Sequence, residues 1–133
     1  MIEVYIDGAS AGDPGRSGAG IFIKTGKGPA LSYSVPLGVM SNHEAEYSSL
    51  LHALKICHDK GYTVVSFRTD SLAVEKAVDK RFAKDKRYEP LLSEALDLID
   101  TFELFFIKWI PSKQNKTADE LARKAIQMNA EGR

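Results

Sequence analysis

The sequence has little of what several familiar kinds of protein chemistry require. It contains a single cysteine, Cys57, among 133 residues, which excludes a disulfide framework and favours a reducing, cytoplasmic location. No apolar run approaches the roughly 18 residues of a membrane-spanning helix, and the first residues show no signal-peptide pattern, so we expect no membrane association. Eighteen basic residues balance eighteen acidic ones, so net charge indicates no class of partner.

Histidine is also scarce, and its placement narrows the catalytic options. His43, His52 and His58 all fall in one predicted helix, and none accompanies a serine or cysteine in a nucleophile motif. The glycine-rich stretch 12–20 lacks the Gly-Lys-Ser/Thr ending of a nucleotide-binding P-loop. The residues therefore give no support to nucleophilic catalysis or to P-loop nucleotide binding.

Length and periodicity predict one α/β domain over residues 1–133. Alternating apolar residues predict strands at 2–7, 18–24, 31–37, 63–69 and 104–109, with a turn at 8–15. Helical periodicity predicts helices at 41–60, 71–80, 88–101 and 117–128. The first three strands suit an antiparallel meander, and the later strand-helix-strand crossovers require parallel pairing. We therefore expect a five-stranded mixed sheet with helices on both faces.

Local signals support these boundaries. Ser41 and Glu44 form a predicted capping box at the start of the first long helix, and Gly61 is placed to end it. A second predicted box, Thr117 with Glu120, opens the last helix. Apolar character assigns Trp109 and the neighbouring pair of phenylalanines at 105–106 to the core.

Four acidic residues stand at unusual places in this pattern. Asp7 and Asp70 end strands, Glu46 lies on the apolar stripe of a helix, and Asp119 opens the last helix. Asp7 could begin a turn, Asp70 could cap a helix, and Asp119 could favour a helix dipole. Glu46 is harder to explain structurally, because an acid on an inward stripe is costly without a partner.

Strand ends and helix starts can converge at one edge of such a sheet. Clustered carboxylates without cysteine or histidine suit a hard divalent cation, Mg²⁺ or Mn²⁺. Two such ions held by shared carboxylates suit phosphodiester hydrolysis, because one activates water and the other stabilises the leaving oxygen.

The sequence resembles type 1 ribonuclease H across nearly its whole length. The motifs that carry the resemblance are Tyr5 to Ser10 with the Gly-Asp-Pro-Gly turn at 12–15, Asn42 to Tyr47, Thr69 to Ser71, Trp109 to Pro111, and Asn115 to Ala122. The resemblance implies a ribonuclease H-like fold and a hydrolase that cuts the RNA strand of RNA·DNA hybrids internally. It also implies Mg²⁺ as cofactor, with Mn²⁺ as a substitute and two ions per site. We expect a monomer whose partner is the hybrid.

The resemblance also implies roles for individual residues. It carries catalysis and metal binding onto the four acids. It implies contacts with the hybrid at Asn42 and at the backbone of the first turn. We add Lys113 as a basic residue that could take the place of the histidine of other family members in the last loop. The implied contact residues are Gly8, Ala9, Ser10, Asn42 and Lys113.

The sequence departs from the family pattern at several positions. Asp13 replaces a frequent asparagine, His43 replaces another, and Leu72 stands where some members have glutamine. The loop 111–116 lacks the histidine that many bacterial members carry before the last aspartate. The basic protrusion of longer relatives is missing, although a short basic stretch at 79–87 could touch phosphates. The chain thus resembles the compact form.

Two other functions compete with a hybrid-specific ribonuclease. A catalytically weak or inactive nucleic-acid-binding module could keep the fold, and the charge of Asp13 and the missing histidine favour it. A DEDD-type 3′ exonuclease shares the sheet, but that group begins with Asp-x-Glu on the first strand. Here Asp7 is followed by Gly8 and Ala9, which argues against the exonuclease.

Overall fold

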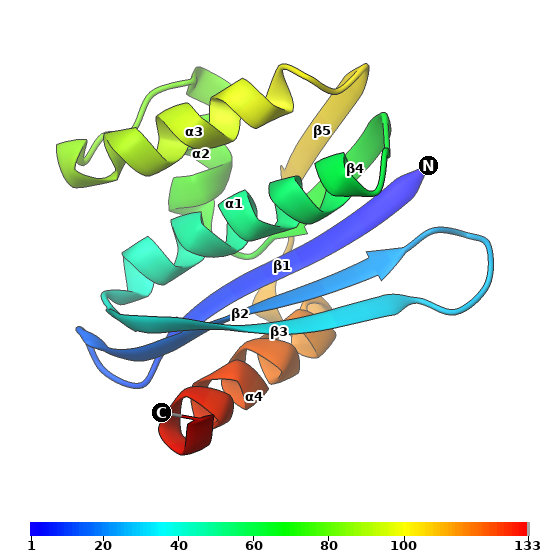
Figure 1. Cartoon of the computed structure of the whole chain (residues 1–133). Coiled ribbons are helices and arrows are strands. Elements are labelled where there is room, and N and C mark those ends of the chain that lie inside the picture. Colours follow the sequence, from blue (N-terminus) through cyan, green and yellow to red (C-terminus); the bar gives the residue numbers. More distant parts are fainter. Residues whose placement is uncertain (133) are drawn as a thin grey trace.

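A five-stranded mixed sheet with helices on both faces organises the chain (Figure 1). The structure, a computed structural model, describes residues 1–132. The strand order is β3-β2-β1-β4-β5, with β1 antiparallel to β2 and parallel to β4. The predicted fold class is confirmed. The strands are β1 (Ile2–Ser10), β2 (Gly15–Lys24), β3 (Leu31–Met40), β4 (Val64–Thr69) and β5 (Leu104–Trp109).

The helices form two unequal layers. In Figure 1, α1 (Asn42–Asp59), α2 (Leu72–Lys80) and α3 (Glu89–Ile99) lie on one side of the sheet, and α4 (Lys116–Gly132) lies on the other. Two short 3₁₀ turns, η1 (Lys86–Tyr88) and η2 (Ser112–Gln114), precede α3 and α4. Within residues 1–132, no helix has both the length and the hydrophobicity to cross a membrane.

The first three strands are longer than the sequence predicted. Strand β1 continues to Ser10, where the expected turn at 8–15 was wrong in its first residues. Gly8, Ala9 and Ser10 stay in the ladder opposite residues 17–19 of β2. The ladder continues because the backbone groups of this glycine-rich stretch are paired by β2 instead of being released into a loop. The candidate contact residues at 8–10 are therefore held by a sheet.

Helix α1 begins and ends as predicted. The Ser41 hydroxyl accepts a hydrogen bond from the Glu44 N–H at 3.1 Å. At the other end Gly61 has a φ of +76°, and its N–H donates to the His58 carbonyl at 3.0 Å. The next N–H, of Tyr62, donates to the Cys57 carbonyl at 3.1 Å, which completes a Schellman motif. The helix that carries Glu46 is thus fixed at both ends.

The start of α4 was predicted wrongly. The helix begins at Lys116, so Thr117 is already inside it and is not the N-cap. The first helical hydrogen bond runs from the Asp119 N–H to the Asn115 carbonyl at 3.1 Å. The helix also extends to Gly132 and not only to Met128. The Asn115 side chain is buried and donates a hydrogen bond to the Ile6 carbonyl of β1, and this tertiary contact decides where the helix starts.

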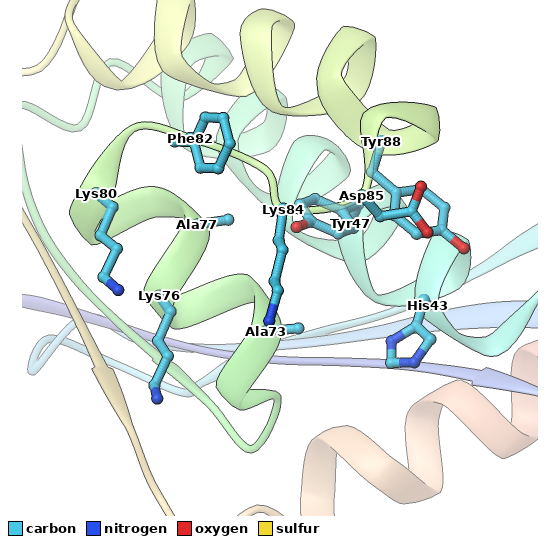
Figure 2. A pocket seen from close by; sticks show the side chains of 10 residues that line it. All are labelled: His43, Tyr47, Ala73, Lys76, Ala77, Lys80, Phe82, Lys84, Asp85 and Tyr88. Carbon is cyan, nitrogen blue, oxygen red and sulfur yellow. The ribbon is translucent and has the colours of Figure 1, made fainter.

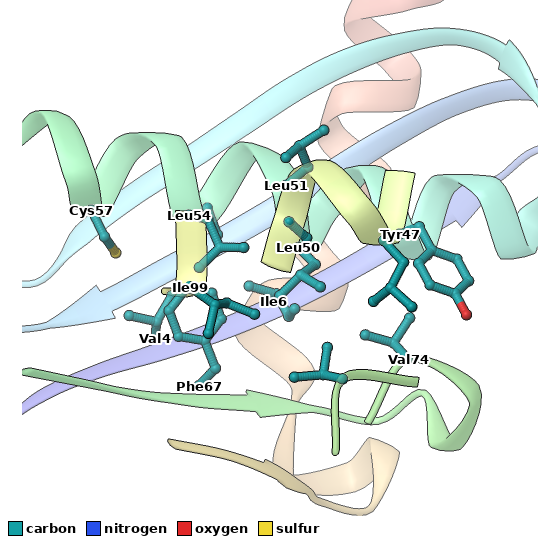
Figure 3. Packing of buried hydrophobic residues seen from close by; sticks show 14 of the residues in the cluster. Val4, Ile6, Tyr47, Leu50, Leu51, Leu54, Cys57, Phe67, Val74 and Ile99 are labelled. Carbon is teal, nitrogen blue, oxygen red and sulfur yellow. The ribbon is translucent and has the colours of Figure 1, made fainter. Parts of the chain in front are cut away.

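The main core lies between the sheet and α1 (Figure 3). Leu50, Ala53, Leu54 and Cys57 are fully buried, which confirms the predicted inward stripe. Burial raises the pKa of the Cys57 thiol to about 12, as expected for an unreactive core residue.

The expected core positions on β5 are only partly buried. Phe105 packs against the core, but Phe106 is 48% exposed and Trp109 is 42% exposed, so their assignment to the core was wrong. Strand β5 is the edge of the sheet and is not among the strands packed by α4. Its outward-facing side chains therefore meet solvent.

Candidate active site

Asp7 lies at the centre of the four predicted acids. Its side chain is 9% exposed on β1, in the middle of the sheet. Burial raises the pKa of its carboxyl to about 8, with further contributions from the charges of Asp70, Asp119 and Glu46. A hydrogen bond between the carboxyls of Asp7 and Asp119 acts in the same direction. The structure therefore brings all four acids within electrostatic reach of one another.

Two glycines explain how α1 and α4 approach Asp7. A Cβ on Gly8 would lie 2.1 Å from the Ala45 carbonyl oxygen, one residue before Glu46. A Cβ on Gly20, the β2 partner of Asp7 in the ladder, would lie 1.9 Å from the Ala118 carbonyl oxygen, one residue before Asp119. Only glycine allows such contact between backbones. Sheet and helices therefore pack closely at the two points beside the acids.

Glu46 and Asp119 both have partners outside the cluster. Glu46 accepts a hydrogen bond from the Ser71 hydroxyl at 3.2 Å, and the His43 imidazole lies 3.3 Å from the same carboxyl. Burial raises the pKa of Glu46, although these two partners oppose the effect. Asp119 accepts from the Arg123 guanidinium, one helical turn later, at 2.9 Å.

The structural explanation for Asp70 as a helix cap is wrong. Ser71 is the N-cap of α2, and its hydroxyl accepts from the Val74 N–H at 3.2 Å. The Asp70 carbonyl accepts from the Trp109 indole N–H at 3.1 Å, which ties the end of β4 to the end of β5. The Asp70 carboxyl therefore does not cap α2, and its charge contributes to the raised pKa of Asp7.

The donor set fits a hard divalent cation in kind. Four carboxylates and no thiol are the ligands that Mg²⁺ and Mn²⁺ prefer. Across the described part of the chain, however, no three histidine, cysteine, aspartate or glutamate side chains are arranged to hold one ion as they stand. The present partners of Glu46 and Asp119 contact one oxygen of each carboxylate, Oε1 and Oδ2, so the other oxygen of each is left to ligate an ion. The raised pKa of Asp7 shows the electrostatic cost that a bound cation would relieve.

An open groove of about 690 Å³ joins three of the acids to four predicted contact residues. Its lining includes Asp7, Glu46, Asp119, Gly8, Ala9, Ser10, Asn42, Arg123 and Lys124. Lys113 is not part of this lining. It lies on η2 and lines a separate cavity of about 220 Å³, so its predicted contact with substrate stays a prediction.

Asp13 has a structural task in the same region. Its carboxylate accepts a hydrogen bond from the Asn42 N–H at 3.2 Å, at the first turn of α1. A carboxylate at a helix N-terminus is favourable. This residue therefore stabilises the helix start where Asn42 and the groove meet.

Sequence reasoning missed the positioning role of Asn115. This side chain is 1% exposed, and its amide donates to the Ile6 carbonyl at 2.8 Å. Its side-chain oxygen is buried without a hydrogen-bond partner among the described residues. The contact ties the residue before α4 to the residue before Asp7. Its place in the last motif was the only sequence signal, since an asparagine in a loop normally faces solvent.

A second cavity, of about 540 Å³, adjoins the acids on the side of α2 (Figure 2). The aromatic rings of Tyr47, Tyr88 and Phe82 and three lysines line it. In Figure 2 the lysines Lys76, Lys80 and Lys84 extend toward the same side of the cavity. His43 lies at its edge and contacts Glu46, so this basic cavity and the carboxylate groove are neighbours.

The fold and the acidic site define the class of protein. Residues 5–125 match the family described as reverse transcriptase-like. The chain belongs to this family and to the type 1 ribonuclease H proteins within it, as its motifs predicted.

Particular relatives follow from sequence comparison. The chain is 42% identical over 129 residues to EbsB of Enterococcus faecalis, a protein that is named a hydrolase only provisionally. The match covers 96% of this chain and 95% of that protein. It is 31% identical over 127 residues to ribonuclease HI of Halobacterium salinarum, covering 94% of this chain and 64% of that protein.

Solved structures agree with this assignment. The crystal structure of RNase H1 from Halobacterium salinarum superposes with a TM-score of 0.88 at 30% identity, covering 95% of this chain and 97% of that one. The crystal structure of LC11-RNase H1, isolated from compost, in complex with an RNA/DNA hybrid gives a TM-score of 0.89 at 26% identity. That match covers 98% of this chain and 99% of the other.

Proposed function

We propose that this protein is a metal-dependent endonuclease that hydrolyses the RNA strand of RNA·DNA hybrids by a two-metal-ion mechanism. The observation that carries the proposal is the buried Asp7 carboxyl, surrounded by Glu46, Asp70 and Asp119 at an open groove. The hybrid complex of a relative with the same fold supports the choice of substrate.

The four carboxylates would hold the divalent ions. When bound, these ions supply a hydroxide nucleophile and stabilise the leaving 3′ oxygen. Asp7 would have to be ionised to hold a cation, because a carboxylate ligand binds in its deprotonated form. No serine, cysteine or histidine nucleophile is needed.

The groove supplies the contacts that select RNA. The backbone groups at 8–10 and the Asn42 side chain lie beside the acids in one continuous lining. The 2′-hydroxyls of an A-like duplex are exposed in its shallow minor groove, where such polar groups can reach them. Asp13 supports this arrangement by holding the Asn42 N–H.

The basic cavity beside α2 would contact the uncut strand. Lys76, Lys80 and Lys84 line it, and His43 connects it to Glu46. Lysines near a duplex neutralise phosphates and add affinity that falls with salt. With few such cations and no basic protrusion, hybrid affinity should be modest and should fall with added salt.

One observation favours the second candidate, a nucleic-acid-binding module with weak or no cleavage. Glu46 is held by His43 and Ser71, and Asp119 is held by Arg123. If these contacts persist in the presence of metal ions, only one oxygen of each carboxylate would be left to ligate, and cleavage would be slow.

Cleavage of an end-labelled RNA·DNA hybrid in Mg²⁺, Mn²⁺ or EDTA tests the proposal. We expect RNA fragments with 5′-phosphate and 3′-hydroxyl ends in either metal and none in EDTA. Asp7→Asn should abolish cleavage, while Asp59→Asn, an exposed acid at the end of α1, should leave the rate unchanged. Hybrid binding without cleavage in both metals would refute the enzyme and support the binding module.

A further inference from the structure

Within residues 1–132, β4 and β5 are not among the strands on which α4 packs. Helix α4 lies against β1, β2 and β3. On β5, by contrast, Leu104 is 50% exposed and Phe106 is 48% exposed. Side chains alternate between the two sheet faces, so these two residues share one face. Edge strands rarely display apolar side chains of this size without a reason.

The strand register shows what else lies on this face. Gly20 of β2 faces α4, so Phe22, two residues later, faces the same way. In the ladder Phe22 pairs with Tyr5, Tyr5 pairs with Arg68, and Arg68 pairs with Lys108. A row of two rings and two cations therefore crosses four strands, with Phe106 beside it.

The row is held together by ring and cation contacts. The rings of Tyr5 and Phe22 have centroids 6.1 Å apart. The Arg68 guanidinium lies 5.4 Å above the Tyr5 ring, and the Lys24 ammonium lies 5.9 Å from it. Arg68 also bonds to Glu3 at 3.0 Å, so the charge of this neighbouring acid is already neutralised. The Arg68 Nε is buried and has no hydrogen-bond partner within residues 1–132.

A small cavity of about 220 Å³ opens at the α4 side of this row. Tyr5 and Phe22 provide its aromatic wall, and Lys24, Lys113 and Lys116 provide its charge. This volume suits one base or one phosphate and not a folded partner. Lys113 lines this cavity and is not in the lining of the carboxylate groove.

The same face continues into the candidate active site. Asp7 follows Tyr5 by two residues on β1, and Asp70 follows Arg68 by two residues at the end of β4. The alternation of side chains places Asp7 on the face that carries the row, and Asp70 follows directly after the last residue of β4. A polymer lying on the row would therefore be continuous with the carboxylates.

We propose that this face, made of Tyr5, Phe22, Lys24, Arg68, Phe106 and Lys108, binds single-stranded nucleic acid that extends from the hybrid at the active site. The half-buried rings of Tyr5 and Phe22 and the exposed ring of Phe106 offer stacking surfaces for bases, and the lysines offer charges for phosphates. A duplex hides its base faces, so the aromatic part of the row suits a single strand. The proposal rests on the proposed function for the idea that the single strand extends from a hybrid in the active site. Binding of the single strand itself requires no cleavage.

Fluorescence anisotropy of the whole protein in EDTA tests the proposal, with a labelled oligothymidylate of about fifteen nucleotides as the probe. Phe106→Ala/Lys108→Glu should weaken its binding at least about tenfold. Lys24→Glu, on the other side of Tyr5, gives an independent reading and should weaken binding about threefold or more. The control Lys60→Glu carries the same charge change on an exposed residue after α1 and should have a much smaller effect. Thermal melting of each variant verifies the fold.

Cleavage of a blunt hybrid in Mg²⁺ separates this proposal from the proposed function. The double variant should cut a blunt hybrid within about twofold of wild type, but lose any preference for a hybrid with a single-stranded extension. Failure of every variant and wild type to cut would refute the enzyme without affecting the binding result. Equal oligothymidylate affinity in the double variant and in Lys60→Glu would overturn the proposal. The proposal would also be overturned if the wild-type protein did not bind the oligonucleotide but bound a leucine- and glutamate-rich peptide, because that result would indicate a protein partner.

Discussion

Replacement of Asp7 by asparagine should make the metal-free protein more stable while it removes activity. The pKa of the Asp7 carboxyl rises from 3.8 to about 8 in the folded state. A group with a raised folded pKa binds more protons folded than unfolded, so the free energy of unfolding falls as pH rises through this interval. Below about pH 4 the carboxyl is protonated in both states, and the penalty disappears.

The magnitude follows from the size of the shift. Each pKa unit corresponds to about 1.36 kcal/mol, so a shift of this size sets an upper limit of about 6 kcal/mol. The neighbouring acids can share protons and turn toward water, which relieves part of the repulsion. An asparagine amide can also donate to Asp70 or Asp119. We therefore expect Asp7→Asn to raise the free energy of unfolding by about 2 to 3 kcal/mol at pH 8 and by little at pH 4.

Urea denaturation in EDTA at pH 4.5, 6 and 8 measures this difference. Glu120→Gln serves as the control, because Glu120 is an exposed acid in the same turn as Asp119. Its substitution should change stability by no more than a few tenths of a kcal/mol at any pH. A loss of stability in Asp7→Asn, or a gain that does not vary with pH, would refute the electrostatic account of the cluster.

Three further substitutions test how the site is built. Gly20→Ala should lower the free energy of unfolding by about 3 kcal/mol or more, measured by urea denaturation, because its Cβ would overlap the backbone of α4; a wild-type midpoint would contradict the close packing. Asn115→Ala should cost about 2 kcal/mol by the same measurement, since the buried Ile6 carbonyl loses its donor, and an unchanged stability would show that water replaces the amide. Ser71→Ala should cost about 1 kcal/mol as a lost helix cap. It also removes one of the two partners of Glu46 and leaves His43, so a metal titration followed by melting should show binding at least as tight as wild type; weaker binding would mean that Ser71 helps to position the carboxylate.

The sequence allowed the fold and the gathering of the four acids to be predicted, but not the way in which they are held. Periodicity located the strands and helices, because the core between α1 and the sheet is built from simple apolar stripes such as Leu50 and Leu54. The acids were found because each breaks such a stripe or ends an element. A partner such as Ser71 for Glu46, 25 residues away in the chain, depends on tertiary geometry, which no local pattern encodes.

The errors share a physical origin in long-range contacts. The start of α4 was misplaced because Asn115 is fixed by a carbonyl of β1, more than a hundred residues earlier. Phe106 was assigned to the core because hydrophobicity alone does not show which side of an edge strand is covered. The turn at 8–15 was drawn too long because pairing with β2 keeps residues 8–10 extended. Tertiary context decided each of these positions.

The central place of β1 has a consequence for the order of events in folding. Asp7 lies on a strand whose neighbours β4 and α4 come from much later in the sequence, so the site needs contacts of large separation before the four charges meet. Loops of that length close late, after local hairpins and helices have formed. The repulsion among the acids is therefore felt mainly after the rate-limiting barrier. Neutralising it, by substitution or by a cation, should slow the unfolding rate and leave the refolding rate almost unchanged.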